Sequence, residues 1–258
     1  MSTNCNLRTL PGRAVGSLAA LIVTSAALLA LAAPPARADL FTPSVSEQIK
    51  LGDQAAAQVE HQYKVIHDAR AAHLQAIGDR LVNALGKDRG PWHWSFHLIQ
   101  SKEVNAFALP GGNTFFFTGL YDKLTNDNER AAVMGHEMTH VRLQHWAHQY
   151  ASQQKRQLGL LVLLGLAHAN NTEATIADLG NQLFTLKYSR GEEEQADQGG
   201  LKNMVAAGYN PCGMIQLFHV LQASGGGGGP SFLSDHPLTS TRIKAAEKEI
   251  RNLGYGPC

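Results

Sequence analysis

The pentapeptide His136-Glu137-Met138-Thr139-His140 constrains this chain more than any other part of its sequence. Two histidines four positions apart share one face of a helix, so both imidazoles can bind the same zinc ion. A glutamate between them lies near the same point and can take a proton from a water molecule that the ion activates. The spacing therefore predicts a helix, with His136 and His140 as metal ligands and Glu137 as the general base of a zinc-dependent hydrolysis.

The flanking residues predict where this helix begins and ends. Asn126 is a favourable N-cap, and Glu129 three residues later completes a capping-box pattern. The predicted helix runs from there to about Tyr150, which places the pentapeptide in mid-helix. We interpret His145 and His148, on its continuation, as surface or packing residues rather than ligands.

A third metal ligand must come from outside the pentapeptide. The metzincin pattern requires glycine and histidine at positions that Leu143 and Trp146 occupy, so that class is excluded. The acidic run 192–194 is the best source of a ligand, and its alternative interpretation is a solvated helix face. Glu193 and Asp197 are four positions apart and share a helix face. One carboxylate can therefore bind zinc while the other accepts an N–H from a ligand histidine, and we favour Glu193 over its neighbours as the ligand.

Hydrophobic periodicity predicts an α+β fold that is mainly α, with a small antiparallel sheet. Aromatic or alternating runs predict strands at 92–99, 105–109 and 114–118, and turn residues join the last two into a hairpin. The other predicted helices are 46–85 with a division near His67, 176–204, a short helix through Leu217 and Leu221, and 240–253. Segment 158–169 is apolar but too short to span a bilayer, so we predict a buried helix, with shallow membrane contact as the alternative.

The N-terminal residues are typical of a targeting segment. Two arginines precede a small and apolar stretch over 14–33, and two prolines separate it from an Ala-x-Ala cleavage pattern at 36–38. This arrangement predicts a secretory signal peptide over 1–38, a mature domain over 39–258 and a periplasmic location. The alternative is a retained membrane anchor, since about 20 apolar residues can span a bilayer.

Charge and cysteine content narrow the class of protein further. The chain has 22 basic and 21 acidic residues, and three of the basic ones precede Asp39, so the mature domain has a net charge of −2. This balance gives no support for nucleic-acid binding. Cys5 lies in the predicted signal peptide, which leaves Cys212 and Cys258 as an even pair in an exported protein. We predict a disulfide between these two, with two free thiols as the alternative.

Several motifs together resemble the HtpX/CAAX-prenyl-protease class of gluzincin peptidases, and most closely its small exported bacterial members. They are N-A-F-A-x-P-G-G, H-E-x-x-H, S-R-x-x-E-x-x-A-D, A-G-Y-x-P and a late H-P, and the resemblance covers about 46–253. It implies a zinc endopeptidase with a zincin-like helical body, one Zn²⁺ per chain, and His136, His140 and Glu193 as its ligands. Gly191 is unusual beside a ligand inside a helix and predicts a local kink.

The resemblance also implies roles for residues outside the ligand set. The developing oxyanion needs an electrophile besides zinc, and His236 of the late H-P motif is the candidate. Its alternatives are a surface-loop histidine or a cap on the open zinc position in a resting state, which the five glycines at 225–229 would permit. Asn105, Ala106, Phe107 and Ala108 are expected to form an edge strand that pairs with the substrate backbone. The alternative for this strand is an ordinary hairpin.

These features predict a zinc endopeptidase of the cell envelope that degrades unfolded or misfolded proteins. One alternative is a latent or chaperone-like module that binds unfolded chains and rarely cleaves them. A structural zinc site is another, but such sites usually close the fourth position with Cys or His, and no cysteine lies near the pentapeptide.

Overall fold

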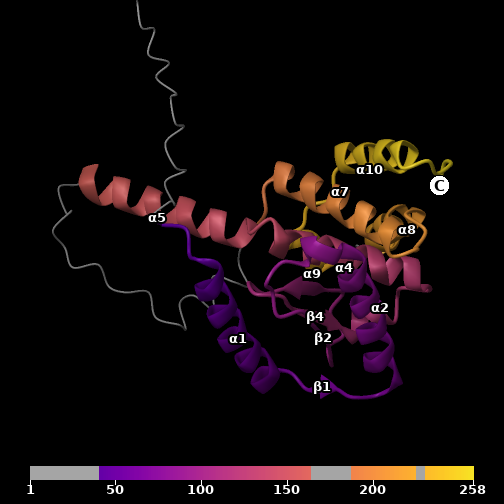
Figure 1. Cartoon of the computed structure of the whole chain (residues 1–258), viewed down its shortest axis with the longest axis horizontal. Coiled ribbons are helices and arrows are strands. Elements are labelled where there is room, and N and C mark those ends of the chain that lie inside the picture. The colour runs from indigo at the N-terminus through magenta and orange to yellow at the C-terminus, as the bar shows by residue number, and fades with distance from the viewer. Residues whose placement is uncertain (1–40, 164–186, 225–229) are drawn as a thin grey trace, which may run out of the picture. The chain divides into compact units, whose positions relative to one another are not determined.

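The computed structural model describes residues 41–163, 187–224 and 230–258 (Figure 1). The described residues belong to one compact unit. The signal peptide that we predict over 1–38 lies outside them and stays a prediction.

Helices form most of the described chain, as the periodicity predicts. The helix predicted over 46–85 is divided into α1 (Val45–Gln62) and α2 (Ala69–Leu85). The second begins where the Asp68 carboxylate accepts the backbone N–H groups of Arg70 and Ala71. The other described helices are η1 (Gly86–Arg89), α3 (Thr118–Tyr121), α4 (Asp127–Arg142), α5 (His145–Leu163), α7 (Arg190–Ala206), α8 (Cys212–Ala223), α9 (Ser231–Asp235) and α10 (Ser240–Asn252).

The small sheet is mixed rather than purely antiparallel as we predict. Its order is β1-β2-β4-β3, with β1 at Val65–Ile66, β2 at Ser95–Ile99, β3 at Ala106–Ala108 and β4 at Asn113–Phe117. The tight turn between β3 and β4 makes that pair an antiparallel hairpin, as expected. The prediction is wrong for β2 and β4, which pair in parallel because the chain passes through β3 before it returns beside β2. As a result β3 lies at one edge of the described sheet.

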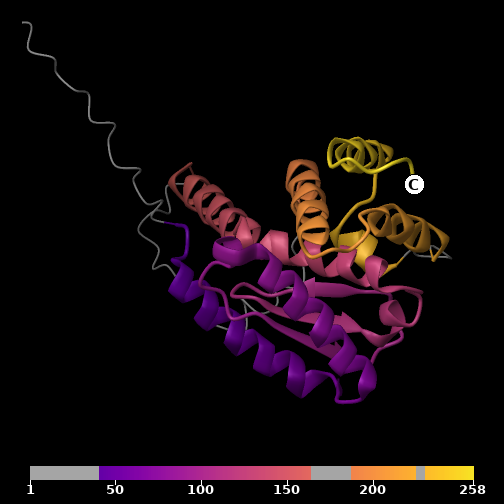
Figure 2. The same cartoon turned by 45° about the vertical axis from the view of Figure 1, so that its right-hand side comes forward.

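The sheet packs against helices on both faces (Figure 2). Strand side chains alternate between faces, so Phe116 joins the larger core with α2 and α4. Phe115 and Phe117 face the opposite way and pack with α1. All five residues of β4 are buried, and the neighbouring edge strand β3 contacts α4.

The helix of the pentapeptide ends earlier than we predict. Asn126 is its N-cap, and its side chain accepts the N–H groups of residues 128 and 129. The predicted continuation to Tyr150 is wrong, because Gln144 has a φ of 54° and interrupts the helix. A new helix, α5, starts at His145.

The apolar segment 158–169 is described only as far as Leu163, within α5. Leu158 and Leu160 are 40% and 55% exposed, so this part of the segment is not the buried helix that we predict. Shallow membrane contact stays a prediction. None of the described helices is both long and apolar enough to cross a membrane.

Candidate metal centre

The acidic run lies at the start of α7. The helix predicted over 176–204 is not continuous, because the described residues just before α7 are not helical, and the earlier ones lie outside the description. Ser189 and Glu192 form a capping box that starts α7. Gly191 therefore stands in the first turn, where no kink is needed to bring Glu193 inward.

A close helix crossing brings α7 against the helix of the pentapeptide. A Cβ atom at Gly200 would lie 3.0 Å from the backbone nitrogen of His136, and one at Gly135 would lie 3.2 Å from the Cα of Gly200. Side chains larger than hydrogen would force the helices apart at this point. The crossing places the first turn of α7 beside the α4 face that carries both histidines.

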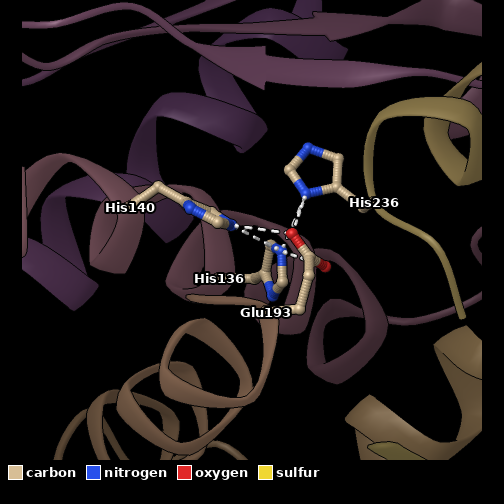
Figure 3. A group of neighbouring side chains, drawn as sticks. All are labelled: His136, His140, Glu193 and His236. Carbon is tan, nitrogen blue, oxygen red and sulfur yellow. Dashed lines mark hydrogen bonds and ion pairs between the residues drawn. The ribbon is translucent and has the colours of Figure 1, made fainter. Parts of the chain in front are cut away.

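Four side chains converge there, as Figure 3 shows: His136, His140, Glu193 and His236. One potential ligand atom from each lies within 4.8 Å of all the others. The Nε2 atoms of His136 and His140 are 3.1 Å apart. The Glu193 Oε1 atom lies 3.4 Å from His140 Nε2 and 2.9 Å from His236 Nδ1. All four side chains are buried.

The chemistry of this group fits zinc. Asp197 Oδ1 lies 2.9 Å from His136 Nδ1, and a carboxylate can only accept, so His136 carries its proton on Nδ1. The Nε2 atom of the neutral His136 ring is then unprotonated, and it faces the other ligand atoms. Two imidazole nitrogens and one carboxylate are a typical set for a zinc ion with an open fourth position.

Arg242, on α10, pairs with the carboxylates of Asp197 and Glu193. It is 2% exposed, and its Nε and Nη2 atoms lie 2.8 and 2.7 Å from the two oxygens of Asp197. Its Nη1 atom lies 2.5 Å from Glu193 Oε2. We did not predict this residue from the sequence. The available signal is that Arg242 stands four and eight positions before Ala246 and Ile250, on the buried face of α10.

The electrostatic environment keeps Glu193 ionised. Burial alone would raise the pKa of Glu193, but the hydrogen bond with His236 and nearby positive charge hold that pKa well below its usual range. An ionised carboxylate is the form that can bind a metal ion.

Glu137 lies on the other side of the group, next to the sheet edge. It is 2% exposed, and its Oε2 atom accepts the backbone N–H of Ala108 at 3.0 Å. Its Oε1 atom has no hydrogen-bond partner among the residues that the structure describes and lies 3.6 Å from His236 Nε2. Burial raises the pKa of Glu137, which makes its carboxylate a stronger base.

His236 lies within the site and is not a surface-loop histidine, since it is 2% exposed. Its backbone is fixed by its own N–H, which donates to Phe232 O at 2.8 Å, and by Arg242, which donates to His236 O at 3.4 Å. Burial lowers the pKa of His236, but the carboxylates of Glu137 and Glu193 outweigh that effect and raise the pKa above its usual value.

The ring of His140 has neighbours that the sequence did not reveal. His145 is 3% exposed, and its Nδ1 atom lies 2.8 Å from His140 Nδ1. The helix break at Gln144 turns it inward, whereas His148 remains exposed. Tyr188 stacks on His140 with ring centroids 3.9 Å apart. Burial lowers the pKa values of both His140 and His145, so both rings are neutral near pH 7.

The residues that we predict to bind substrate form strand β3 and the position before it. Asn105 O and Leu109 N bond to β4, so the alternate residues Ala106 and Ala108 direct their N–H groups to the open edge. The Ala106 N–H donates to the Asn105 side chain, and the Ala108 N–H donates to Glu137. The open edge therefore runs directly past the buried carboxylate.

The predicted disulfide is present. Cys212 and Cys258 are bonded, with their Cα atoms 5.4 Å apart. The bond ties the C-terminal tail to the start of α8, which packs on α4.

Comparison with known proteins places these residues in a family. The sequence matches Peptidase family M48 over residues 68–250. It is 27% identical over 223 residues to the beta-barrel assembly-enhancing protease of Escherichia coli K12, covering 82% of this chain and 45% of that protein. It is 29% identical over 210 residues to the metalloprotease LoiP of the same organism, covering 76% of this chain and 78% of that protein.

A mitochondrial protein is also similar. The metalloendopeptidase OMA1 of Schizosaccharomyces pombe is 32% identical over 157 residues, which cover 60% of this chain and 46% of that protein. The chain spans less than half the length of the beta-barrel assembly-enhancing proteases that it matches.

Proposed function

Because the chain belongs to peptidase family M48, we propose that it is a zinc metalloendopeptidase that cleaves unfolded or misfolded proteins of the bacterial cell envelope. The observation that carries this proposal is the buried convergence of His136, His140 and Glu193 beside Glu137 Oε1, which has no hydrogen-bond partner within the described part of the chain. The names of two relatives, a beta-barrel assembly-enhancing protease and a metalloprotease, support an envelope role. A periplasmic location, after removal of residues 1–38, is part of the same proposal.

The side chains of the site have distinct roles in this mechanism. When bound by His136, His140 and Glu193, zinc supplies a Lewis acid that polarises the scissile carbonyl and acidifies the attacking water. Glu137 accepts the proton of that water at its Oε1 atom, which has no hydrogen-bond partner among the described residues. Before substrate binds, the Ala108 N–H holds Oε2 in place. The same carboxyl group then delivers the proton to the leaving amine.

For His236 the geometry favours a cap on the open metal position in a resting enzyme. Its Nδ1 atom is one of the four converging ligand atoms, and its ring is fully buried between Glu137 and Glu193. Turnover then requires the ring to withdraw, after which it could serve as the second electrophile for the oxyanion. Replacement of His236 by Ala raises peptidase activity if capping dominates and lowers it if oxyanion stabilisation dominates. An unchanged rate would exclude both roles.

The substrate would bind as an added strand beside β3. The outward N–H groups of Ala106 and Ala108 are available for backbone pairing once the Asn105 and Glu137 side chains release them. Pairing through the backbone does not depend on substrate side chains, which suits an enzyme that acts on many unfolded proteins. The contact between Ala108 and Glu137 places the paired backbone at the catalytic base.

The test compares wild type with Glu137→Gln and, as a control, Glu194→Gln. Glu194 belongs to the same acidic run but is not among the converging ligands. We expect Glu137→Gln to retain zinc and to lose at least about 100-fold in casein cleavage, since general-base catalysis contributes that much or more. Glu194→Gln should cleave at the wild-type rate. If Glu137→Gln cleaves normally, the peptidase mechanism is wrong. If wild type suppresses aggregation of unfolded proteins without cleaving them, the chaperone-like alternative is favoured.

A further inference from the structure

We infer that Gln195 and His145 form a hydrogen-bond relay that determines which nitrogen of His140 carries the proton, and so whether the Nε2 atom at the metal position can bind a metal ion. Both are positioning residues, because neither lies among the converging ligand atoms. The inference rests on the proposed function, in which His140 binds zinc. It assigns to Gln195, a residue of the α7 surface, an influence on the metal centre through two intervening rings.

The relay consists of two contacts in series. The Gln195 Oε1 atom lies 3.0 Å from His145 Nε2. The opposite ring nitrogen, His145 Nδ1, lies 2.8 Å from His140 Nδ1. The remaining nitrogen of that last ring, His140 Nε2, points into the converging group and lies 3.4 Å from Glu193 Oε1.

The proton positions along the relay follow from its first hydrogen-bond acceptor, the Gln195 Oε1 atom. An amide oxygen can only accept, so His145 must carry its proton on Nε2. A neutral imidazole has one N–H, which makes His145 Nδ1 an acceptor. The proton between the two rings therefore belongs to His140 Nδ1. That assignment leaves an unprotonated Nε2 on His140, the form that can bind a metal ion.

The opposite orientation of the Gln195 amide would give the opposite result. The amide nitrogen would donate to His145 Nε2, and His145 would then donate from Nδ1 to His140 Nδ1. His140 would have to carry its proton on Nε2, where it would point at the metal position and prevent coordination. The amide orientation of one surface glutamine thus selects between a ligand and a non-ligand tautomer.

The two ligand histidines are therefore held by different means. His136 donates directly to the carboxylate of Asp197, which cannot act as a donor and so permits one tautomer. The tautomer of His140 depends instead on two neutral groups, Gln195 and His145. Each of these can act either as donor or as acceptor in the relay. Stacking of Tyr188 on its face restrains the ring plane without selecting the tautomer.

The experiment measures tautomer and affinity separately in wild type, Gln195→Leu, Gln195→Glu and the control Gln198→Leu. Gln198 is an exposed glutamine on the same helix, outside the relay. Imidazole ¹⁵N chemical shifts of the metal-free protein report the tautomer of His140, at a pH where both rings of the relay are neutral. Competition with a chromophoric chelator gives the zinc dissociation constant.

We expect Gln195→Leu to populate the Nε2-protonated form of His140 and to weaken zinc binding about 10- to 100-fold, as loss of a group that orients a ligand typically does. Gln195→Glu offers an acceptor and no donor, so it should keep the wild-type tautomer and an affinity within about threefold of wild type. Gln198→Leu should match wild type in both measurements.

The inference of a relay is wrong if Gln195→Leu leaves the His140 tautomer and the zinc affinity unchanged. It is also wrong if Gln195→Glu shows the same losses as Gln195→Leu. A wild-type protein that binds no zinc would refute the proposed function instead. The ¹⁵N shifts of the metal-free protein still decide whether the relay exists in that case, so the two failures are distinguishable.

Discussion

Replacement of Arg242 by Met should destabilise the protein more than any other exchange of an arginine on α10. The guanidinium makes two charge-assisted hydrogen bonds to Asp197 and an ion pair with Glu193, and its side chain is 3% exposed. Charge-assisted bonds contribute about 1.5–3 kcal/mol each, so two of them amount to about 3–6 kcal/mol. Loss of one partner from a buried ion pair costs about 3–5 kcal/mol, because the remaining charge stays buried and unpaired. Methionine preserves most of the apolar stem, so the loss reflects the charge rather than a cavity.

The assay is urea unfolding of the metal-free protein, which separates the ion pair from zinc binding. Arg251→Met, an exposed arginine in the last turn of α10, is the matched control and should change the free energy of unfolding by less than about 0.5 kcal/mol. The double variant with Asp197→Leu should be less destabilised than the sum of the single variants, since it removes both charges. A loss below about 1 kcal/mol for Arg242→Met would refute the assignment of this pair as a buried, mutually dependent unit.

The remaining predictions concern the helix crossing, the disulfide and the metal. Gly200→Ala should lower the free energy of unfolding by about 1–3 kcal/mol and weaken zinc binding, because its Cβ would press on the backbone of α4. Gly191→Ala, whose Cβ would meet nothing within 4 Å, should be neutral or stabilising by about 0.5–1 kcal/mol, and equal losses at both sites would contradict this reasoning. Cys258→Ser should lower the free energy of unfolding by up to about 4 kcal/mol, since the bonded cysteines are 46 positions apart, and a reductant should then have no further effect. Free zinc at about 1,000 times its dissociation constant should stabilise wild type by about 4 kcal/mol in thermal unfolding, whereas Glu193→Gln should lose most of this gain. An equal gain in that variant would exclude Glu193 as a ligand.

The parts of the site that the sequence predicts are those that depend on spacing along one helix. His136 and His140 share a face because they are four positions apart, and the same rule pairs Glu193 with Asp197. The α4 N-cap and the disulfide follow from equally local or compositional signals. In each case the decisive information lies within a few residues or in the count of one residue type.

The remaining parts depend on how distant segments meet. Arg242 approaches Asp197 across 45 positions, and no motif marks it. His145 reaches the site only because Gln144 adopts a left-handed conformation, which ordinary helix periodicity does not predict. The parallel pairing of β2 with β4 likewise follows from the path of the whole hairpin rather than from either strand.

The charges around the site support a divalent ion independently of any motif. Three buried carboxylates, those of Glu137, Glu193 and Asp197, face one buried guanidinium, that of Arg242. The net charge of these four groups is −2, in a region from which solvent is largely excluded. Burial of such charges costs free energy unless they are paired. One Zn²⁺ balances them. In the metal-free protein His236 supplies part of the balance, since the carboxylates overcome its burial and raise its pKa. Protonation of His236 and binding of zinc therefore compete for the same carboxylates, which links the position of that ring to occupation of the metal centre.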